Sequence, residues 1–248
     1  MKKQKASMKA VKEFRRHASS YGHYSIIQRQ AVDYLLSWIE ERDLGRVLDI
    51  GCGDGALCRG LRSLPVSFES FLGIDLAEEM LGLHPAGEGV RCLQGDFDDA
   101  AFLSKLEEEG IDTLLSSSAL QWSRDLDGTL SALSRLGERA YLSLFTSGTF
   151  GTLHRIAGIQ SPILGFEESR EILERHYRLR RVERVRYRLH FDSTREIFRY
   201  IKRSGVSGGE ARLGYRRAKR VMEEYPLDYL EFELLFASGE PRRRFSRS

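Results

Sequence analysis

Three glycines at alternate positions form the stretch of this chain best suited to hold a small molecule. Gly51, Gly53 and Gly55 follow the apolar run 47–50, and a helical pattern begins near Ala56. Because glycine has no Cβ, the backbone can adopt positive φ there and approach a ligand closely. The free N–H groups of the next helix would face the same ligand. A tight strand-to-helix turn without a ligand is the alternative interpretation.

Acidic residues stand near the ends of three predicted strands. Asp49 precedes the glycines, Asp75 ends the run 71–75, and Asp96 follows the run 90–94. A carboxylate at Asp75 can accept hydrogen bonds from two vicinal ribose hydroxyls, which suits an adenosine-containing ligand. The glycine spacing is not that of the dinucleotide motif G-x-G-x-x-G, because the third glycine comes one residue early. Capping of the following helix by Asp75 and a turn role for Asp96 remain alternatives.

The acidic residue followed by G-x-G-x-G resembles the first motif of class I S-adenosylmethionine (SAM) methyltransferases. This resemblance implies that Asp75 binds the ribose of SAM and that Asp96 binds the adenine amino group. Asp49 would orient the loop or approach the methionine amino group, and Met80 would lie over the adenine unless it is a core residue. The full set of implied cofactor-binding residues, with no metal among the cofactors, is Asp49, Gly51, Gly53, Gly55, Asp75, Met80, Asp96, Phe97 and Ser116.

Alternating strands and helices must position these residues. We predict strands, each of the first four followed by a helix, over 46–50, 70–74, 90–94, 111–116 and 138–145. This alternation is typical of an α/β fold with a parallel sheet, helices on both faces and a ligand site beyond the carboxyl ends of the strands. Two later strands, at 182–191 and 229–237, would close the sheet as an antiparallel pair. Seven strands in this arrangement match the Rossmann-like sheet of SAM methyltransferases.

The segments around this sheet define the expected domain organisation. Residues 193–224 are predicted to form two helices around a glycine-rich stretch, which would act as a lid over the site. The expected parts are an N-terminal helical segment covering the site (1–45), a SAM-binding Rossmann-like core (46–192), a helical lid insert (193–226), a final sheet strand (227–238) and a disordered tail (239–248).

Composition indicates an ordinary globular protein. The 248 residues, 41% hydrophobic and 30% charged, fit one domain with an appendage. No apolar run approaches about 18 residues, and the basic start lacks the apolar core of a signal peptide, so we expect a cytoplasmic protein. Three scattered cysteines without a C-x-x-C motif argue against a disulfide framework and a zinc site.

The charge pattern and the residues after the fourth strand disfavour nucleic acid as the substrate. The net charge of +3 is mild, and a solvated face is the plainer interpretation of the arginines crowded into the C-terminal half. The stretch 116–122 has the sequence Ser-Ser-Ser-Ala-Leu-Gln-Trp, without the Asn-Pro-Pro-Tyr type of motif found in amino-group nucleic-acid methyltransferases. None of the cysteines follows a proline as in the C5-cytosine enzymes.

The same stretch carries a narrower resemblance. Its end, Ala119-Leu120-Gln121-Trp122, resembles the Ser-Asn-x-Ala-x-Gln-Trp motif of the malonyl-[acyl-carrier protein] O-methyltransferases of biotin synthesis. Ser117 departs from that motif, because Asn is usual there, and the stretch after the third strand is compressed. Further similar residues lie along most of the chain: Phe14, Ala18, Tyr21, Gln28, Leu144, Phe145, Thr146, Thr152, Leu153, His154, Phe191, Asp192, Ile201, Lys202, Ser204, Gly205, Val206, Tyr225, Pro226, Leu227 and Tyr229.

This resemblance implies methyl transfer from SAM to the free carboxylate of a malonyl group on acyl-carrier protein or coenzyme A. A carboxylate with a pKa of about 4 is already ionised, so the reaction needs no general base, and His154 is not required as one. Arg155 is the candidate carboxylate clamp, with Tyr21 and Trp122 lining the substrate pocket. An acidic carrier would dock on basic residues of the C-terminal half, namely Lys202, Arg203, Arg216, Arg217, Lys219 and Arg220.

The sequence leaves three other functions open. The chain could be another class I methyltransferase that acts on a small-molecule carboxylate, of the aconitate type. It could be a non-catalytic partner that keeps the SAM fold, although the intact glycines and Asp75 argue against this. An RNA methyltransferase is supported only by the arginine content.

Overall fold

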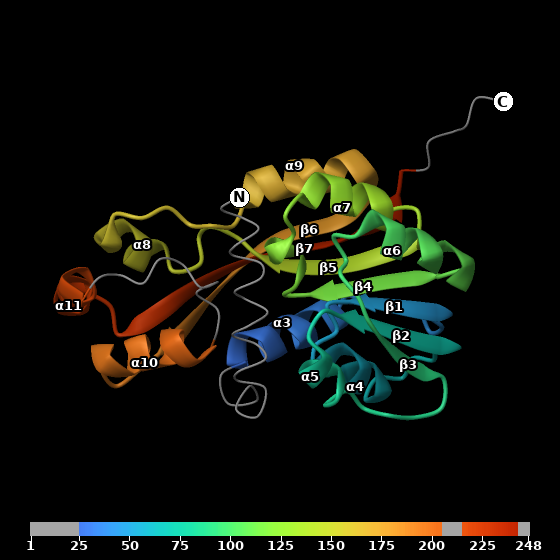
Figure 1. The fold of residues 1–248 in the computed structure, drawn as a ribbon, viewed down its shortest axis with the longest axis horizontal. Coiled ribbons are helices and arrows are strands. Elements are labelled where there is room, and N and C mark those ends of the chain that lie inside the picture. Colours follow the sequence, from blue (N-terminus) through green and yellow to red (C-terminus); the bar gives the residue numbers. More distant parts are fainter. Residues whose placement is uncertain (1–24, 205–214, 243–248) are drawn as a thin grey trace.

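The computed structural model describes residues 25–204 and 215–242, and a seven-stranded sheet organises them (Figure 1). The strands lie in the order β3-β2-β1-β4-β5-β7-β6. Five of them run parallel, while β7 is antiparallel to both β5 and β6. The strand bounds are β1 Arg46–Ile50, β2 Ser70–Asp75, β3 Val90–Gln94, β4 Thr113–Ser117, β5 Arg139–Phe145, β6 Tyr177–His190 and β7 Tyr229–Pro241. The predicted fold class is confirmed.

Helices cover both faces of this sheet. Figure 1 shows α3 and α4 below the parallel strands and α6, α7 and α9 above them. Each side has its own apolar core, built around Leu35 and Leu61 on one side and around Leu130 and Leu173 on the other. The bounds are α3 Ile26–Leu36, α4 Ala56–Arg62, α5 Glu78–Leu81, α6 Ala100–Lys105, η2 Leu106–Glu109, η3 Leu120–Trp122, α7 Leu126–Leu133, α8 Gly151–Ala157, α9 Phe166–His176, α10 Thr194–Ser204 and α11 Tyr215–Glu224.

The burial pattern of each strand follows from its place in the sheet. In β1, the four residues after Arg46 are all buried, because the strand lies in the middle of the sheet and both of its faces are covered. The last strand in the order, β6, alternates exposed arginines with partly buried apolar residues, as an edge strand with one solvated face does. The strand order reverses between β1 and β4. A ligand site is therefore expected where the carboxyl ends of these two strands diverge.

The C-terminal half contains one helix that our predictions did not cover and one segment that they got wrong. We made no prediction for α9, because its sequence is dominated by charged residues and only Ile172 and Leu173 among its apolar side chains are buried. We predicted a disordered tail from residue 239, but β7 continues to Pro241. Gly239 pairs with Ala140 on one side and Leu179 on the other. A Cβ there would lie 2.5 Å from the Arg178 carbonyl oxygen, so this glycine permits a close strand approach rather than marking a turn.

The long antiparallel pair extends beyond the parallel strands. Figure 1 shows β6 and β7 running as a ribbon away from the sheet, with α8, α10 and α11 gathered at its far end. The helices α10 and α11 lie inside the segment 193–226 that we expected to form a lid. Buried side chains from both, Ile197 and Val221, belong to the same apolar core as Leu35 of α3. The helices at the far end of the ribbon therefore share an apolar core with the helices that cover the sheet.

Candidate cofactor and substrate site

The glycine turn after β1 has the backbone conformation that its sequence predicts. Gly51, Gly53 and Gly55 have φ values of +70°, +54° and +80°. A Cβ on Gly51 would lie 2.3 Å from the Cβ of Ala119, and one on Gly55 would lie 2.3 Å from Cδ of Pro85. Both positions are therefore closed to larger residues by conformation and by space. The turn brings β1 directly against the residues that follow β4.

Asp75 holds this turn through its carboxylate. Its Oδ2 accepts a hydrogen bond from the Gly53 N–H at 2.9 Å, and its Oδ1 accepts one from the Ala77 N–H at 2.8 Å. Burial raises the pKa of Asp75, while backbone hydrogen bonds from Ala77, Gly53 and Leu76 act in the opposite direction. A carboxylate has about four acceptor directions, so these three donors do not exhaust it. Asp75 thus caps the chain before α5 and keeps acceptor capacity for a ribose hydroxyl.

A recess lies between the glycine turn, the start of α3 and the end of β4; we call it the glycine-turn recess. Its lining includes Ser25, Gln28, Arg29, Asp49, Gly53 and Ser117. The Asp49 side chain is 1% exposed, and neither of its carboxylate oxygens has a hydrogen-bond partner among the described residues. The same is true of Oε1 of Gln28. Burial, and then the charge of Asp75, raise the pKa of Asp49 well above its usual value.

These unpaired acceptors provide a test of whether SAM fits the recess. Buried polar atoms without partners are costly, so they indicate a ligand that donates hydrogen bonds or carries positive charge. The methionine part of SAM carries an ammonium and a sulfonium group, which match the Asp49 carboxylate and the Gln28 amide oxygen. Arg29, an exposed residue on the same lining, forms no ion pair within the described part of the chain. Its guanidinium suits the carboxylate of the same methionine part.

Sequence reasoning missed Gln28 and Arg29 as residues of this recess. Gln28 was indicated only through a family resemblance, and Arg29 was not predicted at all. The available signal was a pair of polar residues on a helix whose next turns, through Ala31, Val32 and Leu35, are buried. The sequence signal that we did not use was a Gln at the start of an otherwise apolar helix face; the structure shows that this Gln is buried.

The other predicted cofactor residues lie around the turn in different ways. Met80 is buried, and its Cε lies 3.7 Å from the place where a Cβ on Gly53 would be. Cε1 of Phe97 lies 3.9 Å from the equivalent point on Gly51. Ser116 is fully buried, and its Oγ donates to the Ile50 carbonyl at 2.8 Å. That hydroxyl ties β4 to β1, and it is Ser117 that lines the recess.

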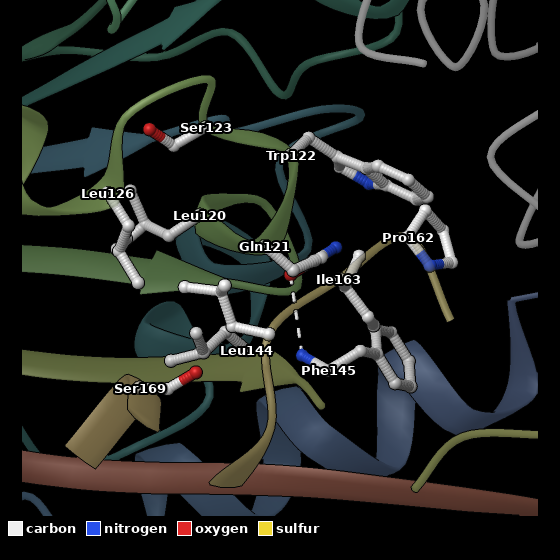
Figure 2. Close-up of a pocket in the computed structure, with 11 residues that line it drawn as sticks. Leu120, Gln121, Trp122, Ser123, Leu126, Leu144, Phe145, Pro162, Ile163 and Ser169 are labelled. Carbon is white, nitrogen blue, oxygen red and sulfur yellow. Dashed lines mark hydrogen bonds between the residues drawn. The ribbon is translucent and has the colours of Figure 1, made fainter. Parts of the chain in front are cut away.

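A second recess lies behind Trp122, between η3, the end of β5 and the segment before α9; Figure 2 shows it with its lining residues. Gln121 spans it, with its Nε2 donating to the Ser118 carbonyl at 2.6 Å and its Oε1 accepting from the Phe145 N–H at 3.4 Å. Ser118 has φ of +60°, which is strained for a residue other than glycine. The indole Nε1 of Trp122 is buried without a hydrogen-bond partner among the described residues.

Of the remaining predicted substrate residues, the structure describes only Arg155, which is not brought into these two recesses. Arg155 is exposed on α8, where its Nη2 donates to Oγ1 of Thr152 at 3.2 Å, and it lines neither recess. Burial lowers the pKa of its neighbour His154, so this histidine is neutral at neutral pH. Tyr21 lies outside the described residues.

The predicted docking residues are only partly described. Lys219 and Arg220, both exposed on α11, form ion pairs one turn along the helix with Glu223 at 3.7 Å and Glu224 at 2.7 Å. These carboxylates neutralise part of the local positive charge. The side chains of the other four, Lys202, Arg203, Arg216 and Arg217, lie outside the described residues.

Comparison with known proteins identifies the family. A family model described as a methyltransferase domain matches residues 48–139, which include the glycine turn, Asp75 and Asp96. A malonyl-[acyl-carrier protein] O-methyltransferase of Chlorobium phaeovibrioides is 32% identical over 238 residues, which cover 89% of this chain and 88% of the relative. The chain belongs to the malonyl-[acyl-carrier protein] O-methyltransferase family. The narrower resemblance in the sequence is thereby confirmed.

Solved structures agree with the fold of this methyltransferase family member. The YcgJ protein of Bacillus subtilis aligns with a TM-score of 0.61 at 16% identity, covering 87% of this chain and 99% of that chain. A phosphoethanolamine N-methyltransferase of Haemonchus contortus, in complex with S-adenosyl-L-methionine, aligns with a TM-score of 0.53 at 16% identity, covering 88% of this chain and 53% of that one. At these identities the likeness concerns the fold alone.

The described residues contain neither a membrane-spanning helix nor a metal-ligand cluster. No helix within 25–204 and 215–242 is long and apolar enough to cross a membrane. In the same residues, no group of three or more His, Cys, Asp or Glu side chains is arranged to hold a metal ion.

Proposed function

We propose that this chain transfers a methyl group from SAM to the free carboxylate of a malonyl group carried on acyl-carrier protein. The observation that carries the proposal is the set of buried acceptors of Asp49 and Gln28, which have no hydrogen-bond partner within 25–204 and 215–242. They lie in the glycine-turn recess, at the strand-order reversal. The family relative, 32% identical and matched over 88% of its length, supports the identity of the acceptor. When bound, SAM supplies the methyl group on a positively charged sulfur.

The residues around the recess divide the binding of SAM between them. Asp49 and Gln28 accept from its ammonium group, and Arg29 pairs with its carboxylate. Asp75, fixed by the Gly53 and Ala77 N–H groups, accepts from the ribose hydroxyls. Asp96, Phe97 and Met80 form the adenine side, and Gly51, Gly53 and Gly55 allow the backbone to approach. Ser116 supports this arrangement through its hydrogen bond to Ile50.

The acceptor reaction needs positioning rather than proton transfer. A malonyl carboxylate, with a pKa of about 4, is ionised at neutral pH, so no proton must be removed before it attacks the methyl group. The protein has to desolvate this carboxylate and hold it in line with the methyl. His154 stays neutral because burial lowers its pKa, and it has no proton to accept in this scheme.

Arg155 is our proposed clamp for the malonyl carboxylate, with Tyr21 and Trp122 lining the pocket. Its side chain donates to the neutral hydroxyl of Thr152, so its guanidinium retains donors for an anionic substrate. We expect Arg155→Ala to lower turnover and to leave the affinity for S-adenosylhomocysteine, the product of SAM, unchanged. Arg135→Ala is the matched control, because Arg135 is an exposed arginine paired with Glu107. Normal malonyl transfer by the Arg155 variant would place the clamp elsewhere.

The acidic carrier is proposed to dock on the basic residues of α10 and α11. Lys219 and Arg220 are exposed there, and Lys202, Arg203, Arg216 and Arg217 belong to the same two helices. Reversing several of these charges should raise KM for the carrier substrate, because charge complementarity acts mainly on the rate at which enzyme and carrier associate. Binding of S-adenosylhomocysteine should be unchanged. An equal loss of both properties would argue for a structural defect.

The substrate is tested by methyl transfer from labelled SAM to four acceptors in parallel. These are malonyl-acyl-carrier protein, malonyl-coenzyme A, free malonate and aconitate. We expect label on the malonyl thioesters, with the carrier form as the better substrate. Label on a free acid and on neither thioester would assign the chain to a different carboxylate methyltransferase activity, of the aconitate type.

A further inference from the structure

Arg124 joins the two loops that flank the glycine turn. It follows η3 two residues after Trp122, and its guanidinium reaches the loop after β3. Its Nη2 lies 2.8 Å from Oδ2 of Asp96, and its Nε lies 3.0 Å from Oδ2 of Asp98. Its backbone N–H donates to the same Asp98 oxygen at 2.8 Å. One arginine therefore fixes two carboxylates on a neighbouring loop.

Asp98 gives this arrangement a rigid base. Its side chain is 6% exposed, and its Oδ1 accepts hydrogen bonds from Oγ of Ser123 and Oγ1 of Thr129, both at 2.7 Å. Because Asp98 cannot turn without breaking these bonds, the Nε of Arg124 is fixed and its Nη2 is directed at Asp96. A side chain that orients another group in this way acts through that group.

Asp96 is consequently held at both carboxylate oxygens. Oδ1 accepts from the Asp98 N–H at 2.9 Å, and Oδ2 accepts from Arg124. Each oxygen keeps one further acceptor direction, and these directions are set by the two existing bonds. The next residue, Phe97, lies against Gly51 of the turn. Asp96 therefore directly precedes a residue that contacts the turn, on the side where we propose that the adenine binds.

We propose that Arg124 is a positioning residue that orients Asp96 toward the 6-amino group of the cofactor and thereby sets selectivity for adenine over 6-oxopurine. This inference rests on the proposed SAM site. A carboxylate held in place accepts hydrogen bonds from a 6-amino group but opposes the oxygen of a 6-oxopurine, which is also an acceptor. A carboxylate released from Arg124 can rotate away from that oxygen, so the penalty against the 6-oxopurine falls.

Arg124 is suited to substitution because its ion pair with Asp96 is half-exposed. The two side chains are 38% and 35% exposed, and such pairs contribute little to stability. Asp98 is buried, but without the guanidinium it keeps three other donors: the backbone N–H of residue 124 and the hydroxyls of Ser123 and Thr129. We therefore expect Arg124→Met to fold, since Met keeps most of the aliphatic stem. Arg124→Lys is the conservative variant, because it keeps the positive charge but lacks the planar fork that donates to Asp98 through Nε and to Asp96 through Nη2. Arg135→Met removes a comparable exposed arginine, paired with Glu107, and is the matched control.

The test is calorimetric binding of S-adenosylhomocysteine and of S-inosylhomocysteine, its 6-oxopurine analogue, to the full chain and these variants. We expect wild type and Arg135→Met to favour the adenine ligand strongly. Arg124→Met should reduce the ratio of the two dissociation constants by about tenfold or more, the scale of one charged hydrogen bond, and Arg124→Lys should reduce it less. Asp96→Asn should abolish the selectivity, with no further change when Arg124→Met is added.

Failure of this inference is distinguishable from failure of the proposed function. An unchanged ratio in Arg124→Met, with both affinities lowered equally or not at all, would overturn the positioning role. A wild-type protein that binds both ligands equally would also overturn it, while methyl transfer to malonyl-acyl-carrier protein could still stand. A wild-type protein that binds neither ligand would overturn the cofactor site and the inference together.

Discussion

Gly51 is the position where the geometry makes the sharpest quantitative prediction. Its φ of +70° belongs to the left-handed region, which costs a residue with a Cβ about 1–2 kcal/mol. A Cβ on Gly51 would also lie 2.3 Å from the Cβ of Ala119. Ordinary carbon contacts are about 3.5–4.0 Å, so η3 or the turn must move by more than about 1 Å. Overpacking of this kind costs roughly 1–3 kcal/mol.

The two costs can be separated with a compensating substitution. Gly51→Ala alone should lower the free energy of unfolding by about 2–5 kcal/mol. Combining it with Ala119→Gly removes the contact between the two Cβ atoms but leaves the backbone strain at residue 51. In a double-mutant cycle we therefore expect a favourable coupling of about 1–3 kcal/mol between the two positions.

The assays are urea unfolding for stability and calorimetry for S-adenosylhomocysteine. Because the turn backbone is proposed to contact the ligand, displacing it should weaken binding about tenfold or more in Gly51→Ala. The double variant should recover part of that affinity as well as part of the stability. A Gly51→Ala protein as stable as wild type, or a double variant no better than the single one, would refute this explanation of the turn.

Three further predictions concern residues around the same turn. Burial, and then the charge of Asp75, raise the pKa of Asp49, so binding of the ligand ammonium group should expel a proton from this carboxyl, and the affinity should rise as pH rises through its pKa. Calorimetry in buffers of different ionisation enthalpy should detect the released proton, and its absence would exclude Asp49 from the site. Asp75→Ala should weaken S-adenosylhomocysteine binding by about 1–3 kcal/mol, and an unchanged affinity would remove Asp75 from the ribose site. Ser118→Gly should raise the urea midpoint, because it relieves a φ of +60° and deletes a buried hydroxyl without a partner among the described residues; a lower midpoint would show that the hydroxyl is used.

Much of the fold was predictable because the parallel strands are marked by short apolar runs between turn residues. β1 and β3 coincide with their predicted bounds, and the positive φ values of the glycine turn follow from its sequence. The helix α9 was not predictable in this way, because its charged residues leave only a narrow buried stripe. The end of β7 was missed because Ser238 and Gly239 have the composition of a turn. Close approach of the β6 backbone, a feature of the tertiary structure, explains the glycine there.

For the candidate site, the sequence indicated which residues take part but not which partners their side chains have. The order of Asp49, the glycines and Asp75 along the chain indicated an adenosine ligand, and the turn does bring these residues together. Sequence alone could not show that the Ser116 hydroxyl donates its hydrogen bond to the Ile50 carbonyl. It also could not show that Arg124, distant in sequence from Asp96, holds that carboxylate. Such pairings depend on loop geometry after the strands, for which the sequence has no periodic signal.

The proposed reaction is tested most directly by determining which chemical bond carries the transferred methyl group. Malonyl-acyl-carrier protein would be incubated with the enzyme and methyl-labelled SAM, and the labelled carrier would then be treated with mild alkali. We expect one added methyl per malonyl group, as an ester that releases labelled methanol. Label that stays on carbon after this treatment, or a malonyl group that acquires no label, would contradict the proposed reaction.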